Sequence, residues 1–163
     1  MTSLGSIRRD GARRAIRFER RYGAPPGEVW AALTEPERLA RWLAPTEIEP
    51  RPGGRLRIDF GNDVVTGSVL RFEPPTLLEV EWRFTGEDES VLRFELAADG
   101  IGTLLVLEHR ALGEPHATGY GAGWHAHLDL LEGLLAGRAP GSWDERFAKL
   151  LPRYRDVAAA SLP

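Results

Sequence analysis

The chain has 163 residues, of which 42% are hydrophobic and 28% are charged, and its formal net charge is −3. This length predicts one domain with a sizeable core. The small negative charge gives no reason to expect nucleic acid or an anionic membrane as a partner. The lack of cysteine excludes disulfides, thiolate metal sites and cysteine catalysis. No run approaches the ~18 apolar residues of a membrane span, and the first residues lack the apolar core of a signal peptide, so we expect a cytoplasmic protein.

The first third of the chain alternates between strand and helix signals. Two stretches, residues 4–9 and 15–22, flank Asp10-Gly11, a dipeptide typical of a tight hairpin turn, and apolar residues alternate with charged ones in the second stretch. Pro25-Pro26-Gly27 then begins a short helix, and Thr34-Glu35-Pro36-Glu37 predicts a capping box for a second one. The two helices should leave the sheet open at one end. Trp42, on the second helix, either fills that opening as core or lines a ligand entrance.

Four or five further strands should follow as a meander. Apolar residues alternate with polar ones over residues 56–60, 78–84, 92–96 and 103–109, and turn residues separate the stretches. The stretch 64–73 is apolar in both phases with Gly67 inside it, which predicts a bulge or a sharp bend. We therefore expect an antiparallel sheet of about six to seven strands in total.

The longest helical pattern covers residues 119–135. Its main apolar residues recur at helical spacing on one face, and they are Trp124, Leu128, Leu131 and Leu135. A helix this apolar must be covered, and the preceding chain is almost entirely strand. The prediction is an α+β helix-grip fold, in which a curved antiparallel sheet wraps around this helix. We expect residues 111–118 to form a loop, and the glycine-rich start at residues 119–123 to be a flexible beginning of the helix.

The end of the chain predicts one more helix. Ser142-Trp143-Asp144-Glu145 is a second capping box, and the apolar residues after it favour a short amphipathic helix that ends before Pro152. Residues 153–163 could continue it as a frayed helix. We divide the chain into a helix-grip domain, residues 1–141, and a C-terminal helical extension, residues 142–163, packed on the same domain.

Several short motifs occur in a familiar order. They are Pro25-Pro26-Gly27-Glu28-Val29-Trp30, Leu39-Ala40-Arg41-Trp42, Pro52-Gly53-Gly54-Arg55, Gly67-Ser68-Val69, Leu107-Glu108-His109 and Gly123-Trp124. Over roughly residues 4–135 this set resembles the domain homologous to the heat-shock protein 90 ATPase activator, in the START-related SRPBCC superfamily that includes the birch pollen allergens. The resemblance implies a helix-grip fold with a hydrophobic cavity between sheet and helix. Relatives bind lipids, hormones or polyketides, and some are cyclases or dehydratases. The segment after Ser142 lies beyond the resemblance and could be specific to this protein.

The phases of the strands and of the long helix predict which side chains line the cavity. The candidate ligand-binding residues are Trp42, Phe60, Val69, Trp82, Phe94, Leu105, Leu107, His109, Trp124, Leu128 and Leu131. Such a lining, mostly apolar with few polar anchors, is typical of small-molecule sites.

His109 is the polar residue of greatest interest. By phase with Leu105 and Leu107 it points inward, where it would hold a ligand, transfer a proton, or simply be a core histidine bonded to the backbone. His125 and His127 lie ~200° apart on a helix, so they cannot share a metal ion. We expect no metal and no cofactor.

Three functions remain open from the sequence. The first is a binder of a hydrophobic or aromatic small molecule, and the second is an enzyme of the polyketide cyclase or dehydratase type that uses a cavity histidine. The third is a co-chaperone-like interaction module with a chaperone as partner. The sequence also leaves a homodimer open.

Overall fold

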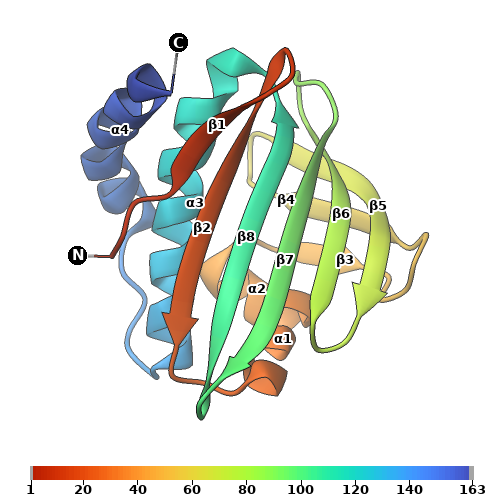
Figure 1. The fold of residues 1–163 in the computed structure, drawn as a ribbon. Coiled ribbons are helices and arrows are strands. Elements are labelled where there is room, and N and C mark those ends of the chain that lie inside the picture. The colour runs from red at the N-terminus through yellow and green to blue at the C-terminus, as the bar shows by residue number, and fades with distance from the viewer. Residues whose placement is uncertain (1, 162–163) are drawn as a thin grey trace.

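The computed structural model describes residues 2–161, and its framework is one curved antiparallel sheet with all helices on one side (Figure 1). The eight strands are β1 (Ser6–Asp10), β2 (Arg13–Tyr22), β3 (Thr46–Ile48), β4 (Arg55–Asp59), β5 (Val64–Glu73), β6 (Leu77–Phe84), β7 (Ser90–Asp99) and β8 (Gly102–Leu112). The four helices are α1 (Pro26–Thr34), α2 (Pro36–Trp42), α3 (Glu114–Leu135) and α4 (Trp143–Ala160).

The sheet has the order β1-β2-β8-β7-β6-β5-β4-β3, so the predicted meander from β4 to β8 is confirmed. The N-terminal hairpin is also confirmed, and it joins the meander where β2 pairs with β8. There is one strand more than the six to seven predicted, because β3 is only three residues long and leaves little periodicity to detect. In β5 the register shifts between Val69 and Arg71, and a Cβ on Gly67 would lie 1.8 Å from the Glu81 carbonyl oxygen. Gly67 therefore permits a close approach of two strands.

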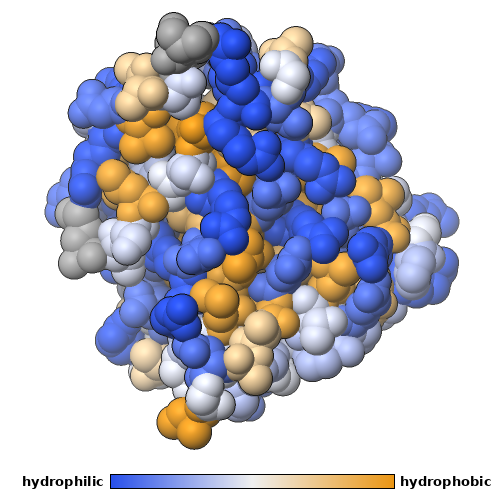
Figure 2. Space-filling model, in the orientation of Figure 1, coloured by the Kyte–Doolittle hydropathy of each residue, from blue (hydrophilic) through white to orange (hydrophobic). Residues whose placement is uncertain are grey.

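The two faces of the sheet differ in chemistry. The inner face supplies buried apolar side chains in the predicted phases, such as Leu78, Val80 and Trp82 on β6. Figure 2 shows mostly hydrophilic side chains on the opposite face, and ion pairs such as Arg93 Nε–Glu95 Oε1 at 2.6 Å lie there. The alternation over residues 78–84 predicts an exposed Glu79, but this residue is only 8% exposed, because Arg93 and Arg110 both contact its carboxylate.

The long helix begins earlier than the sequence predicted. Residues 114–118 belong to α3, so the expected loop over residues 111–118 is wrong for most of its length. Gly113 is the N-cap, and a proline occupies the first turn, where its missing N–H costs no hydrogen bond. The glycines at the predicted flexible beginning instead lie inside the helix, and Gly121 is buried against the ring of Tyr154 from α4.

The C-terminal helix is longer than predicted. Ser142 caps it, since its hydroxyl accepts a hydrogen bond from the Glu145 N–H at 3.1 Å, as the capping box predicted. The predicted end before Pro152 is wrong, because the helix runs on to Ala160 with Pro152 inside it. Tyr154 follows the proline and is fully buried, so tertiary packing outweighs the local cost of the proline. Residues 162–163 of the predicted extension lie outside the described residues.

The predicted capping box at Thr34 is wrong. Thr34 is the last residue of α1, and its hydroxyl donates to the Trp30 carbonyl oxygen at 2.8 Å. The N-cap of α2 is Glu35, whose side chain makes no capping hydrogen bond. The short helix predicted after Pro25-Pro26-Gly27 is α1, and it buries Val29, Ala32 and Leu33.

A buried polar cluster holds α3 to the sheet and to the N-terminal segment. Arg20 of β2 contacts Asp129 of α3 at 2.8 Å, and their side chains are only 6% and 10% exposed. The Thr2 hydroxyl donates to the same carboxylate at 2.7 Å and also lies 2.8 Å from His125 Nε2. The Tyr154 hydroxyl lies 2.7 Å from His125 Nδ1, so α4 joins the same network.

Two glycines on α3 make a matched pair for a test of this packing. A Cβ on Gly121 would lie 2.6 Å from the Tyr154 ring, whereas a Cβ on Gly119 would meet nothing within 4 Å. We expect Gly121→Ala to lower the free energy of unfolding by ~1–3 kcal/mol through overpacking. Gly119→Ala should raise it by ~0.5–1 kcal/mol, because alanine has the better helix propensity. Urea denaturation of both variants measures the difference, and equal changes would contradict the close contact between α3 and α4.

Candidate ligand-binding site

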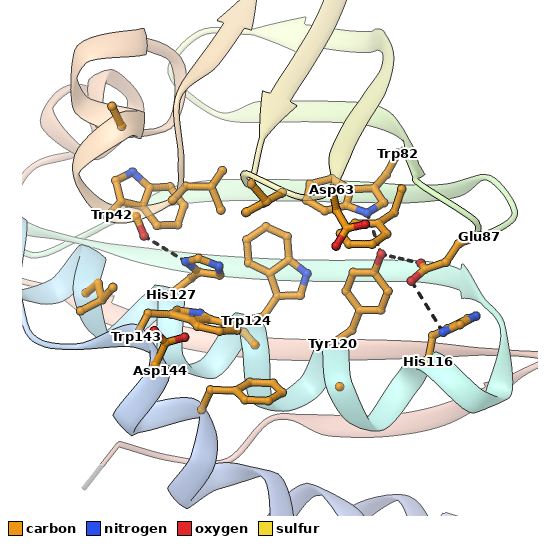
Figure 3. A pocket seen from close by; sticks show the side chains of 18 of the residues that line it. Trp42, Asp63, Trp82, Glu87, His116, Tyr120, Trp124, His127, Trp143 and Asp144 are labelled. Carbon is orange, nitrogen blue, oxygen red and sulfur yellow. Dashed lines mark hydrogen bonds and ion pairs between the residues drawn. The ribbon is translucent and has the colours of Figure 1, made fainter.

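A cleft of about 720 Å³ opens where the sheet leaves its end uncovered, between β6, α2, α3 and the beginning of α4 (Figure 3). Its lining consists mainly of aromatic side chains with a few polar ones around them. The lining residues are Ala40, Arg41, Trp42, Leu43, Phe60, Asp63, Trp82, Phe84, Glu87, Pro115, His116, Gly119, Tyr120, Gly123, Trp124, His127, Leu130, Trp143, Asp144 and Phe147.

The aromatic rings pack against one another around the cleft. Trp82 and Trp124 have ring centroids 5.5 Å apart and form the wall between the sheet and α3. Trp143 and Phe147 of α4 are stacked, with centroids 4.8 Å apart and planes at 16°. Rings held in this way present flat apolar faces to the cleft.

One end of the cleft carries a chain of hydrogen bonds. The Trp82 Nε1–H donates to the Tyr120 hydroxyl at 2.9 Å, and that hydroxyl lies 2.6 Å from Glu87 Oε1. Burial raises the pKa of Tyr120 above its ordinary value, and the hydrogen bond to Glu87 raises it further. The phenol therefore keeps its proton and donates it to the carboxylate. His116 Nδ1 lies 3.6 Å from the other Glu87 oxygen.

The other end of the cleft contains His127. Its Nδ1 lies 3.0 Å from the Trp42 carbonyl oxygen. A carbonyl only accepts, so Nδ1 carries the proton and Nε2 keeps its lone pair. Burial lowers the pKa of His127 to about 4, although the bond to Trp42 opposes this shift. At neutral pH the ring is uncharged, and Nε2 is a hydrogen-bond acceptor.

The structure divides the predicted ligand-binding residues into two groups. Trp42, Phe60, Trp82 and Trp124 line the cleft. The other predicted residues do not line it and belong to the packed interior, and they are Val69, Phe94, Leu105, Leu107, His109, Leu128 and Leu131. These seven residues were predicted to line the cavity, and that prediction is wrong for this cleft. Their inward phase was right, but α3 packs directly on the middle of the sheet and leaves space only at its open end.

His109 is the clearest case. It is fully buried, and its Nδ1 accepts the Trp124 Nε1–H at 3.0 Å. Nε2 must then carry the proton of the neutral ring and donate it to Ser90 Oγ at 2.8 Å. Burial lowers the pKa of His109 to about 3, so the ring stays neutral. Both ring nitrogens are engaged, and neither is available to a ligand or a proton transfer. His109 is a core histidine, bonded to side chains and not to the backbone.

Several residues of the cleft were missed from the sequence. Tyr120 lies four residues before Trp124 and thus shares its helix face, which was a detectable signal. His127 was considered from the sequence as a metal ligand, together with His125, and was not among the predicted ligand-binding residues. Glu87 and Asp63 come from turns, and their contribution depends on a tertiary arrangement that no periodicity reports. Trp143 and Phe147 were assigned to the C-terminal helix, but not to the cleft.

Within residues 2–161, no group of three or more histidine and acidic side chains is placed to hold a metal ion. No helix in the same part of the chain has the length and apolar character needed to cross a membrane.

Comparison with known families agrees with this architecture. A sequence model of the family described as "Activator of Hsp90 ATPase homolog 1-like protein" matches residues 23–136. The chain belongs to this family. It is thereby a member of the SRPBCC superfamily, and the predicted helix-grip fold is confirmed. No curated protein matches the chain.

Solved structures extend the comparison. CalU16 from Micromonospora echinospora is 30% identical, with a TM-score of 0.80 over 94% of this chain and 95% of CalU16. A protein from Bordetella parapertussis encoded by gene BPP1335 is 34% identical, with a TM-score of 0.72 over 91% of this chain and 87% of that protein. DynU16, described by its place in the dynemicin biosynthetic locus, is 26% identical with a TM-score of 0.63, and the match covers 85% of this chain and 47% of DynU16.

The C-terminal helix is not specific to this protein. The solution structure of CalU16 matches 98% of this chain, which is more than residues 1–141 alone can supply. In this chain α4 packs along α3 and supplies Trp143 and Phe147 to the cleft. The extension is thus part of the fold that forms the site.

The bonding of His109 predicts its mutational behaviour. His109→Leu should lower the free energy of unfolding by ~2–4 kcal/mol, because it leaves the buried Trp124 N–H and the Ser90 hydroxyl without this partner. Binding of any cleft ligand per folded molecule should change little. Urea denaturation and ligand titration on the same variant check both statements. Lost affinity with full stability would show that His109 reaches the ligand.

Stability should depend on pH through His127. Its folded pKa, about 4, is below the ordinary histidine value of ~6.5, so the unfolded chain takes up the proton first as the pH falls. The stabilisation is complete above pH ~6.5 and is lost progressively as the pH falls toward 4, by roughly 3 kcal/mol in total. His127→Gln, which cannot titrate, should make this decline shallower in urea denaturation series, and His109 and His125, whose pKa values are also lowered by burial, account for the decline that remains. An unchanged slope would contradict the burial of a neutral imidazole.

Proposed function

We propose that this chain binds a planar aromatic small molecule in the cleft between the open end of the sheet, α3 and α4. The observation that carries the proposal is the aromatic lining of a cleft of about 720 Å³. This volume is within the ~300–1,000 Å³ typical of small-molecule sites. It is large enough for several fused or linked rings.

The arrangement of the rings favours a flat ligand. The indoles of Trp82 and Trp124 come from β6 and α3, and the stacked pair Trp143 and Phe147 comes from α4, so rings from three elements line the cleft. A planar molecule between such walls would gain stacking and edge-to-face contacts beyond simple area burial. A flexible acyl chain would lose more conformational entropy for the same contact.

The relatives support a role with small molecules. DynU16 is described by its place in the dynemicin biosynthetic locus, so at least one similar protein is encoded beside biosynthetic genes. The catalytic alternative, an enzyme of the polyketide cyclase or dehydratase type, no longer has His109 as its acid or base, since both nitrogens of that ring are engaged. A chaperone partner, a homodimer and a cytoplasmic location stay predictions.

A blocking variant tests the proposal. Gly119 lies on the cleft wall with open space around its Cβ position, so Gly119→Phe should fill part of the cleft without disturbing the core. We expect a panel of hydroxylated stilbenes, anthraquinones and naphthols to quench the tryptophan fluorescence of the wild type and to raise its melting temperature. Gly119→Phe should weaken this binding at least about tenfold, equivalent to ~1.4 kcal/mol.

Gly119→Ala is the matched control, because it changes the same position without adding bulk and should bind as the wild type does. The proposal fails if no aromatic compound binds, or if Gly119→Phe binds the panel as tightly as Gly119→Ala does.

A further inference from the structure

The hydrogen-bond donors on the aromatic walls are already occupied. Each of the four indole N–H groups that line the cleft donates to an acceptor within the protein. Trp42 donates to the Ala32 carbonyl at 2.8 Å and Trp82 to the Tyr120 hydroxyl at 2.9 Å. Trp124 donates to His109 at 3.0 Å and Trp143 to the Gly123 carbonyl at 3.2 Å. None of these groups is free to donate to a ligand.

The single phenol of the cleft is occupied as well. The Tyr120 hydroxyl accepts from Trp82 and donates to Glu87 Oε1 at 2.6 Å. This sequence of bonds has a direction, from the indole N–H through the phenol to the carboxylate. It therefore ends in an acceptor, because a carboxylate has only lone pairs to offer.

What remains available to a ligand is mostly acceptors. His127 Nε2 has its lone pair free, and the second Glu87 oxygen lies 3.6 Å from His116, too far for a good hydrogen bond. Within residues 2–161 the carboxylates of Asp63, which is half-buried, and of Asp144, which is exposed at the rim, have no hydrogen-bond or ion-pair partner, and both residues line the cleft. The remaining side-chain donors, on Arg41 and His116, belong to exposed residues at the rim.

We infer that the cleft selects its ligand by hydrogen-bond donors that the ligand carries, received by His127 Nε2 at one end and by the Glu87 carboxylate at the other. This inference rests on the proposed function and names the substrate class for the same site. The ligand is an aromatic molecule that bears phenolic hydroxyls or a protonated amine. An ether or carbonyl oxygen at these positions would face another acceptor, His127 Nε2 or the Glu87 carboxylate, and no hydrogen bond could form.

The energetic basis is the cost of an unpaired polar group. A ligand without the donor removes water from His127 and Glu87 and returns no hydrogen bond, and such a loss costs ~1–3 kcal/mol per group. Hydroxyl and ammonium groups share the required donor. The ammonium would also gain from the carboxylates and from nearby indole faces, so an amine is the stronger candidate for the Glu87 end.

Matched stilbenes separate these cases in isothermal titration calorimetry. Trihydroxystilbene, its trimethyl ether, unsubstituted stilbene and an aminomethylstilbene, whose benzylic amine is protonated at neutral pH, have the same skeleton. Hydrophobicity alone favours the ether and the bare hydrocarbon. We expect the wild type instead to bind trihydroxystilbene about ten- to a hundredfold more tightly than either of them, the equivalent of one paired donor. Tighter binding of the aminomethylstilbene would identify the ammonium group as the preferred donor.

Two variants assign the acceptors. Glu87→Gln keeps an oxygen for Tyr120 but presents an amide donor to the ligand, and His127→Phe keeps a ring but removes the acceptor nitrogen. Each should reduce the preference for trihydroxystilbene over stilbene about tenfold. Asp88→Asn is the control, because Asp88 adjoins Glu87 in sequence but pairs with Arg13 and does not line the cleft. His127→Leu, which also removes the acceptor but has a smaller side chain, provides a second variant if His127→Phe is unstable.

The outcomes distinguish this inference from the proposed function. Equal affinity for all four stilbenes would overturn donor selection and leave aromatic binding in place. A preference that persists in both variants would overturn the roles of Glu87 and His127. Binding of none of them would contradict the proposed function itself, and the inference with it.

Discussion

The geometry of the site depends on the buried ion pair between Arg20 and Asp129. Its atoms lie 2.8 Å apart with both side chains almost inaccessible, so removal of one partner would leave a charge buried without compensation, which is typically far more costly than loss of a surface pair. The guanidinium also lies 5.6 Å from the centre of the Phe18 ring on the same strand. These contacts fix one face of α3 against β2.

Because one face of α3 is fixed, its opposite face is fixed too. His125 and His127 lie ~200° apart around the helix. His125 faces the polar cluster, where it contacts Thr2 and Tyr154, and His127 faces the cleft. A small rotation of α3 would disrupt the cluster and move Tyr120, Trp124 and His127 away from the cleft together. The polar cluster therefore determines which side chains of α3 face the cleft, although it does not itself line the cleft.

The sequence predicted the parts of the fold that depend on local periodicity. The hairpin at Asp10-Gly11, the five-strand meander and the long amphipathic helix all follow from alternation or helical spacing within single segments. The errors arose where tertiary contact outweighed local preference. Gly121 lies within a helix because Tyr154 occupies the space of a side chain, and Pro152 lies within a helix because Tyr154 anchors the chain beyond it.

The site was less predictable than the fold for a related reason. The alternation of side chains along β8 correctly predicted that His109 points inward. Alternation does not distinguish a side chain in the packed interior from one that lines a cavity. The difference is set by Trp82, Trp124 and Tyr120, which contact His109 with ring centroids 5.3, 6.2 and 4.8 Å away and separate it from the cleft. These rings come from two elements that only the folded structure brings together.

The hydrogen-bond donors on the cleft walls already donate within the protein, and this has two physical consequences. Indoles and a phenol that already donate within the protein are held in fixed orientations, so their order is established before a ligand arrives and binding loses less side-chain entropy. The same bonds remove these groups from recognition. Specificity is left to the groups that do not stabilise the walls, His127 Nε2 and the free carboxylate oxygens. The rigid aromatic walls thus select for the shape of the ligand, and the few acceptor atoms without a partner in the protein select for hydrogen-bond donors on it.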